Sequence, residues 1–151
     1  MIAYKDIEHE NLGDAPFIGA RLLSAQCSRN CKNCFNQSLK DEPTKYATEI
    51  QIISMVLSDK LNEGIIFGGL EWTEQPWDLI VLVRLALLNK LQVMIYTGTT
   101  EKEFIKRVPQ LKDLPIWCKF GHYDETQKVA EYISNGIKLA SANQYIKFMK
   151  N

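Results

Sequence analysis

Three short apolar segments of this chain each run directly into glycine, and this repeated arrangement restricts the fold more than any other feature of the sequence. They are Ile65-Ile66-Phe67 before Gly68-Gly69, residues 91–96 before Thr97-Gly98, and residues 116–120 before Gly121. Apolar residues recur at helical spacing over 47–62, before the first segment, and residues 77–90, between the first and the second, are typical of a helix that is apolar on most of its faces. Strands that alternate with helices predict an α/β fold with mostly parallel strands.

Local signals add detail to this prediction. Residues 21–25 are typical of a first strand, and residues 144–149 of a last one. Thr48 with Gln51, and Thr100 with Glu103, have the spacing of capping boxes that open helices. A short helix is expected over 124–134, ending at Asn135-Gly136.

The length limits the architecture. A chain of 151 residues is one domain, with no visible internal boundary, and is too short for eight βα units, so any barrel must be incomplete. Ligands of such folds bind at the carboxyl ends of the strands, where glycine lets the backbone approach a ligand closely. The glycines therefore indicate a site, although tight βα turns alone would also explain them.

Charge and hydropathy exclude two classes of partner. Eighteen basic and eighteen acidic residues give a formal net charge of +0, which disfavours nonspecific binding to nucleic acid. The longest apolar run, residues 79–88, contains Arg84 and is too short to cross a bilayer core of about 30 Å. The first residues lack the pattern of a signal peptide, so a cytoplasmic location is expected.

Three of the four cysteines are crowded together directly after the first predicted strand. Cys27, Cys31 and Cys34 form a C-x3-C-x2-C pattern, and three thiolates on a tight loop suit a soft metal or an iron–sulfur cluster. Because no fourth ligand is nearby, the pattern favours a [4Fe–4S] cluster with one iron open to a substrate or cofactor.

A zinc site stays open as an alternative, but a structural zinc site needs four ligands. The only histidines, His9 and His122, are distant in sequence. The remaining cysteine, Cys118, lies in an apolar stretch and is interpreted as a small buried hydrophobe.

The cysteine spacing resembles the radical S-adenosylmethionine (SAM) superfamily, and further segments resemble its anaerobic ribonucleoside-triphosphate reductase activating protein family. The matching segments run in family order from about residue 12 to 146: Phe35-Asn36 after the third cysteine, Gly68-Gly69-Leu70-Glu71, Tyr96-Thr97-Gly98, Gly121-His122-Tyr123 and Ser141-Ala142-Asn143-Gln144.

This resemblance implies a single radical SAM domain over residues 1–151, with an incomplete (βα) barrel-like parallel sheet of the compact radical SAM type. It implies that Cys27, Cys31 and Cys34 hold three irons of a [4Fe–4S] cluster and that the fourth iron binds SAM. No catalytic residue beyond the cluster is implied. The residues implied to contact SAM are Phe35, Asn36, Gly68, Gly69, Glu71, Thr97 and Gly98.

The function implied by the resemblance is a radical SAM oxidoreductase of the glycyl-radical enzyme activating type. It would cleave SAM reductively and generate a glycyl radical on the large subunit of an anaerobic ribonucleotide reductase, with flavodoxin or ferredoxin as electron donor. Trp72, Trp77 and Tyr123 are candidates for the rim that contacts the partner. The alternatives are a radical SAM enzyme acting on a small molecule or peptide, and a noncatalytic zinc- or cluster-binding module.

Overall fold

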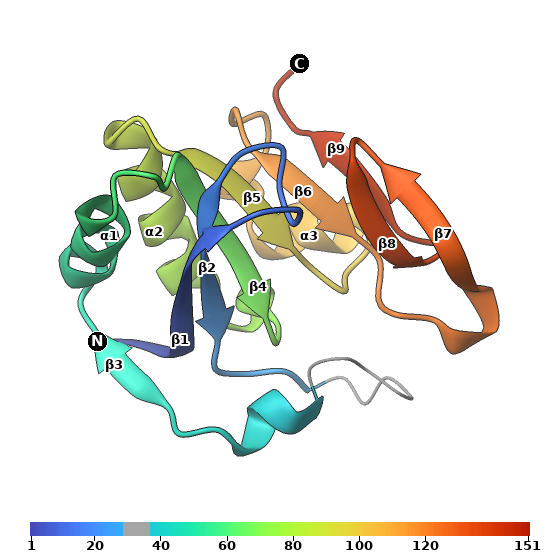
Figure 1. Cartoon of the computed structure of the whole chain (residues 1–151), viewed down its shortest axis with the longest axis horizontal. Helices are drawn as coiled ribbons and strands as arrows, with labels where there is room; N and C mark the ends of the chain where they lie inside the picture. Colours follow the sequence, from blue (N-terminus) through green and yellow to red (C-terminus); the bar gives the residue numbers. More distant parts are fainter. Residues whose placement is uncertain (29–36) are drawn as a thin grey trace.

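The computed structural model describes residues 1–28 and 37–151, with the side chains of residues 130 and 131 left out (Figure 1). In this part of the chain a seven-stranded sheet has the strand order β3-β1-β2-β4-β5-β6-β9. The strands are β1 (Ile2–Asn11), β2 (Gly19–Ser24), β3 (Lys45–Ala47), β4 (Gly64–Gly69), β5 (Gln92–Tyr96), β6 (Trp117–Phe120) and β9 (Tyr145–Phe148).

The centre of the sheet is parallel, as the alternation of strands and helices predicts. Strand β4 pairs in parallel with β2 and β5, and β5 pairs in parallel with β6. The outer strands differ, since β1 and β3 on one side and β9 on the other pair antiparallel. Within the described residues the sheet is open, with β3 and β9 at its two edges and no closed barrel.

Helices cover one face of this sheet. They are α1 (Glu49–Ser58), α2 (Pro76–Leu88) and α3 (Glu101–Arg107), with 3-10 turns η1 (Gln37–Asp41), η2 (Trp72–Glu74), η3 (Pro109–Leu111) and η4 (Glu125–Gln127). Both predicted capping boxes are confirmed at the starts of α1 and α3. The helices bury their apolar sides against alternate strand residues such as Leu22, Phe67, Ile95 and Cys118. No helix among the described residues is long and apolar enough to span a membrane.

The other face carries a second, smaller apolar cluster that includes Ile66 of β4 and Met94 of β5. It is covered by Phe17, by Ile146 of β9 and by Leu139 of β8. Strand β8 (Ile137–Ser141) pairs antiparallel with β7 (Lys128–Ser134), and this hairpin lies beside β9 (Figure 1). The sheet is therefore sandwiched between helices on one face and the hairpin with the chain before β2 on the other.

The helix expected over residues 124–134 is wrong. Only the short turn η4 forms there, and the chain continues as strand β7. Asn135 and Gly136 have φ values of 51° and 79°, the left-handed pair that a tight hairpin turn requires. The Asn-Gly pair therefore joins two strands and does not end a helix.

Candidate functional site

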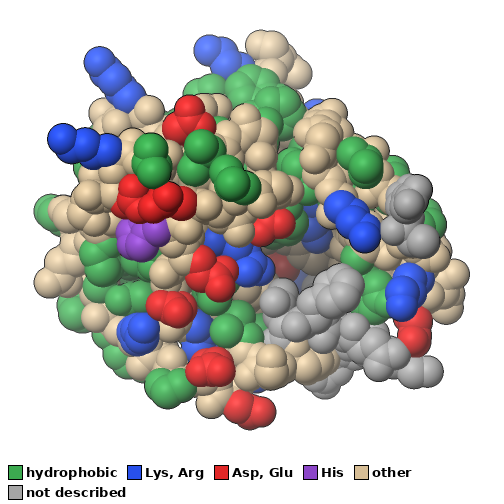
Figure 2. Space-filling model, viewed as in Figure 1, with side chains coloured by type: hydrophobic (Ala, Val, Ile, Leu, Met, Phe, Trp, Pro, Cys, Tyr) green, Lys and Arg blue, Asp and Glu red, His purple; other side chains and the backbone are tan. Residues whose placement is uncertain are grey.

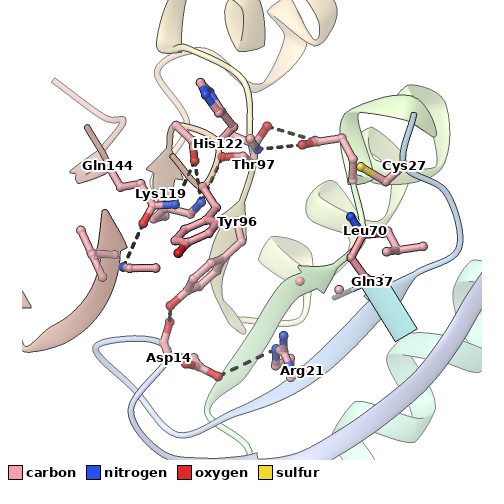
Figure 3. Close-up of a pocket in the computed structure, with 18 of the residues that line it drawn as sticks. Asp14, Arg21, Cys27, Gln37, Leu70, Tyr96, Thr97, Lys119, His122 and Gln144 are labelled. Atoms are coloured by element: carbon pink, nitrogen blue, oxygen red, sulfur yellow. Dashed lines mark hydrogen bonds and ion pairs between the residues drawn. The ribbon is translucent and has the colours of Figure 1, made fainter. Parts of the chain in front are cut away.

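A cavity of about 330 Å³ opens at the carboxyl ends of β4, β5 and β6 (Figure 3). Its wall comes from these strand ends, from the residues after β2, and from β8 of the hairpin. The face in Figure 2 is hollowed near its centre, with acidic and basic side chains around the hollow. The cavity therefore lies where ligands bind in parallel α/β sheets.

The structure brings most of the predicted site residues to this one cavity. Its lining includes these sequence-predicted residues: Cys27, Gly68, Gly69, Glu71, Thr97 and Gly98. Cys31, Cys34, Phe35 and Asn36 lie outside the described residues. Residues from three separate chain segments thus converge as the motifs predict, and their binding of SAM stays a prediction.

Glu71 connects the ends of two neighbouring strands from a buried position. Its Oε2 accepts hydrogen bonds from Thr73 N at 3.0 Å, Thr73 Oγ1 at 2.6 Å and Thr97 Oγ1 at 3.0 Å. Its Oε1 accepts one from Gly98 N at 2.7 Å. A carboxylate has about four acceptor sites, and the geometry of these bonds leaves Oε1 as the oxygen able to take a further donor.

A side chain at Gly68 and one at Gly69, the two glycines after Phe67, would meet different neighbours. A Cβ on Gly69, at φ +88°, would lie 2.8 Å from Ser24 N and 2.9 Å from Leu23 Cα. A Cβ on Gly68 would meet only the flexible side chain of Arg21, with Nε at 3.0 Å. Gly69 is therefore required by close contact with the backbone of β2, whereas Gly68 keeps space open on the cavity side.

The opposite side of the cavity holds a lysine that the sequence analysis did not single out (Figure 3). Lys119 of β6 is 8% exposed, and its Nζ donates to Gly121 O at 2.9 Å and Thr97 O at 3.3 Å. The same Nζ lies 5.5 Å from the centre of the Tyr96 ring. The alternation of side chains along a strand could have predicted this position. Because Cys118 lies in the core, its neighbour Lys119 must face the opposite side of the sheet.

Tyr96 is fixed in this wall by its own hydroxyl, which donates to Asp14 O at 2.8 Å. Burial, and then the nearby Asp14 carboxylate, raise the pKa of Tyr96 far above its ordinary value. Asp14 also lies 3.8 Å from Arg21, which pairs with Glu8 at 2.9 Å. The cavity thus presents a neutral phenol between charged groups of both signs.

Of the three aromatic residues expected at a partner rim, one is excluded by the structure. Trp72 is 0% exposed, and its indole Nε1 donates to Leu22 O at 3.1 Å inside the fold. Its indole stacks edge-on against Phe67 at 5.5 Å, so it belongs to the core. Trp77 is 69% exposed at the start of α2, and Tyr123 lines the cavity.

Cys27 is half-buried and lies in the cavity wall (Figure 3). This position suits a thiolate that holds a metal centre in contact with a small molecule in the cavity. Among the described residues no set of three or more His, Cys, Asp or Glu side chains gathers as a metal site. His9, one possible zinc ligand, lies instead in β1, bonded to the Asn62 amide at 2.9 Å. That Cys27 binds a metal centre together with Cys31 and Cys34 stays a prediction, because both of these cysteines lie outside the described residues.

The comparison with protein families points to an iron–sulfur protein. The model of a family described as "4Fe-4S single cluster domain" matches residues 18–146, from the start of β2 into β9. The matched part includes Cys27, Cys31 and Cys34 as well as every strand end that lines the cavity. No curated protein matches the chain.

Proposed function

The chain belongs to the family of 4Fe-4S single cluster domains, and we propose that it is a radical SAM activase. In this proposal it cleaves SAM reductively and generates a glycyl radical on the large subunit of an anaerobic ribonucleotide reductase. The observation that carries the proposal is the convergence of Cys27, Gly68, Glu71 and Gly98 on one cavity at the sheet's carboxyl edge. The compact radical SAM type of fold is part of the same proposal, supported by the open, centrally parallel sheet.

The cluster would be held by Cys27, Cys31 and Cys34. When bound, it supplies the electron that breaks the sulfonium–C5′ bond of SAM. The chain's own residues bind and orient the substrate and exclude water from the reactive carbon.

The size and the charges of the cavity support the proposal that SAM binds there. Its volume of about 330 Å³ lies within the range of small-molecule sites. Glu71 Oε1 can accept a hydrogen bond from the amino group of SAM, and the Lys119 ammonium complements its carboxylate. Gly68 lines the cavity beside the Arg21 side chain and adds no side chain of its own.

The partner side of the proposal is supported by the open sheet and by exposed aromatic surface. A radical formed in the cavity must reach a glycine of another protein, and the sheet that the described residues form is not closed around it. Trp77 is strongly exposed, and Tyr123 lines the cavity, so these two residues are the proposed contacts of the rim. A flavodoxin or ferredoxin would supply the electron, and the expected location is the cytoplasm.

Anaerobic reconstitution with iron and sulfide tests this proposal. The loaded protein, with SAM and a strong reductant, should release 5′-deoxyadenosine and methionine. Addition of an anaerobic ribonucleotide reductase should then give the paramagnetic doublet of a glycyl radical. Both signals should be lost in Cys27→Ala and kept in Cys118→Ala.

Two other results would contradict the proposal in different ways. SAM cleavage without a doublet on any reductase would favour a small-molecule or peptide substrate. One zinc per chain, with no labile sulfide after strictly anaerobic purification, would favour a noncatalytic metal-binding module.

A further inference from the structure

The segment Glu71–Gln75, which follows β4 and contains η2, contacts residues 25–28 at the start of the cysteine pattern through three of its residues. Glu71 N donates to Gln26 O at 2.7 Å, and Ala25 N donates to Gln75 Oε1 at 3.2 Å. Glu74 Oε2 accepts from both Ser28 N at 2.7 Å and Ser28 Oγ at 3.2 Å. Residues 25–28, which contain Cys27, are therefore hydrogen-bonded to one short turn.

This turn is itself held rigidly. Trp72 and Thr73 are buried, and the Gln75 amide donates to Ala3 O of β1 at 2.9 Å. Arg107 of α3 donates to Thr73 Oγ1 at 2.9 Å. A rigid turn that is tied to β1 and α3 can define the position of Cys27 more sharply than a loop could by itself.

Glu74 is the acidic residue of this turn that bonds directly to the cysteine pattern, whereas the Glu71 carboxylate is bonded to Thr73, Thr97 and Gly98. The amide that it binds belongs to Ser28, the residue directly after Cys27. Amide N–H groups beside a ligating cysteine are potential donors to sulfur, and such hydrogen bonds, with net charge, set the reduction potential of iron–sulfur clusters. A carboxylate on this amide keeps the proton directed away from sulfur and adds a charge that opposes reduction.

We infer that Glu74 is a positioning residue that fixes the Cys27 end of the cysteine pattern and lowers the reduction potential of the cluster bound there. This inference rests on the cluster of the proposed function, but on neither SAM cleavage nor the partner. It assigns Glu74 no contact with substrate.

Two variants separate the charge from the anchoring. Glu74→Gln keeps an oxygen that can accept from Ser28 N but removes the charge, whereas Glu74→Ala removes both. Glu49→Gln is the matched control, because Glu49 lies in the first turn of α1 and does not line the cavity. All variants are loaded with iron and sulfide, and their fold is checked by circular dichroism.

The first readout is a redox titration of the loaded protein without SAM. The paramagnetic signal of the reduced cluster measures how much of the cluster is reduced at each potential. Glu74→Gln and Glu74→Ala should raise the ratio of reduced to oxidised cluster at a fixed applied potential by roughly three- to tenfold. The second readout is the rate of iron loss to a chelator, which should rise about threefold or more in Glu74→Ala alone. Glu49→Gln should match the wild type in both.

The possible failures are distinguishable. If the wild type binds a cluster and both Glu74 variants match it in potential and in iron loss, the inference is wrong while the proposed function stands. If only iron loss changes, Glu74 anchors the chain and the claim about the potential is wrong. If the wild type binds no cluster, the proposed function fails and this inference fails with it.

Discussion

The carboxylate of Glu71, just after β4, accepts a hydrogen bond of 2.7 Å from the backbone N–H of Gly98, just after β5. The same carboxylate accepts from Thr97 Oγ1 and from both donors of Thr73. Two neighbouring parallel strands are therefore tied together at the edge where the cavity opens. Glu71 has a structural function in the fold, whatever it binds in the cavity.

We expect Glu71→Ala to destabilise the protein by about 2–4 kcal/mol, because it leaves the buried Thr73 N–H and the half-buried Gly98 N–H without an acceptor. Urea unfolding under anaerobic conditions measures the loss. Glu49→Ala, at a half-buried helix start, should cost less than about 1 kcal/mol. Equal losses in the two variants would show that the Glu71 contacts contribute little.

The two glycines after Phe67 should respond differently to alanine. Gly69→Ala places a Cβ against the β2 backbone at a positive φ, so it should cost about 2 kcal/mol or more in unfolding free energy. Gly68→Ala meets only the Arg21 side chain, so it should cost less than about 1 kcal/mol.

Gly68→Ala is therefore the cleaner test of the cavity. Its methyl group occupies cavity space, and calorimetry on the cluster-loaded protein should show SAM affinity reduced severalfold. Unchanged affinity in the folded, loaded variant would mean that SAM does not lie against Gly68.

A surface ion pair joins the start of α3 to β9 and should make stability depend on pH. Lys147 Nζ lies 2.6 Å from Glu101, and its hydrogen bond, with that of Tyr145, holds the pKa of Glu101 below its ordinary value of 4.5. The stabilisation is therefore present above pH 4.5 and is lost as the pH falls through the lowered pKa. Both side chains are partly exposed, so it amounts to less than about 1 kcal/mol.

Lys147→Met measures this pair. The variant should unfold more easily than the wild type at pH 7, and the difference should shrink in strong acid and in high salt. A difference that persists unchanged at low pH would assign the effect to packing of the lysine stem.

Structural features that depend on residues close together in the sequence are predicted well. The helical spacing and both capping boxes are local patterns, and they are found at α1 and α3. Strand β1 was missed because it is an antiparallel outer strand with exposed polar residues, so its apolar pattern is weak. The hairpin was missed although Asn135-Gly136, between segments of strand character, is a strong hairpin signal.

In the candidate site, too, some features can be predicted from local sequence and others depend on long-range contacts. Glycines at strand ends locate the carboxyl edge of the sheet, and the structure brings Gly68 and Gly98 to one cavity. The pairing register decides which side chains face one another, and Tyr96 is paired with Lys119 across β5 and β6. The charge of this wall and the burial of Trp72 depend on such long-range contacts, which no local pattern encodes.

The four cysteines should divide into two classes on substitution. Cys118 is fully buried among core residues, and burial raises the pKa of its thiol far above the ordinary value, so at neutral pH it is a thiol and a poor metal ligand. Cys118→Ala should therefore retain the cluster at a stability cost of about 1–2 kcal/mol. Cys27→Ala, Cys31→Ala and Cys34→Ala should each abolish stable binding of about four irons per chain, because each removes one of the three proposed thiolate ligands. Iron and sulfide contents, with the visible absorption of anaerobically prepared protein, measure both classes. A cluster lost in Cys118→Ala but kept in Cys34→Ala would overturn the ligand assignment.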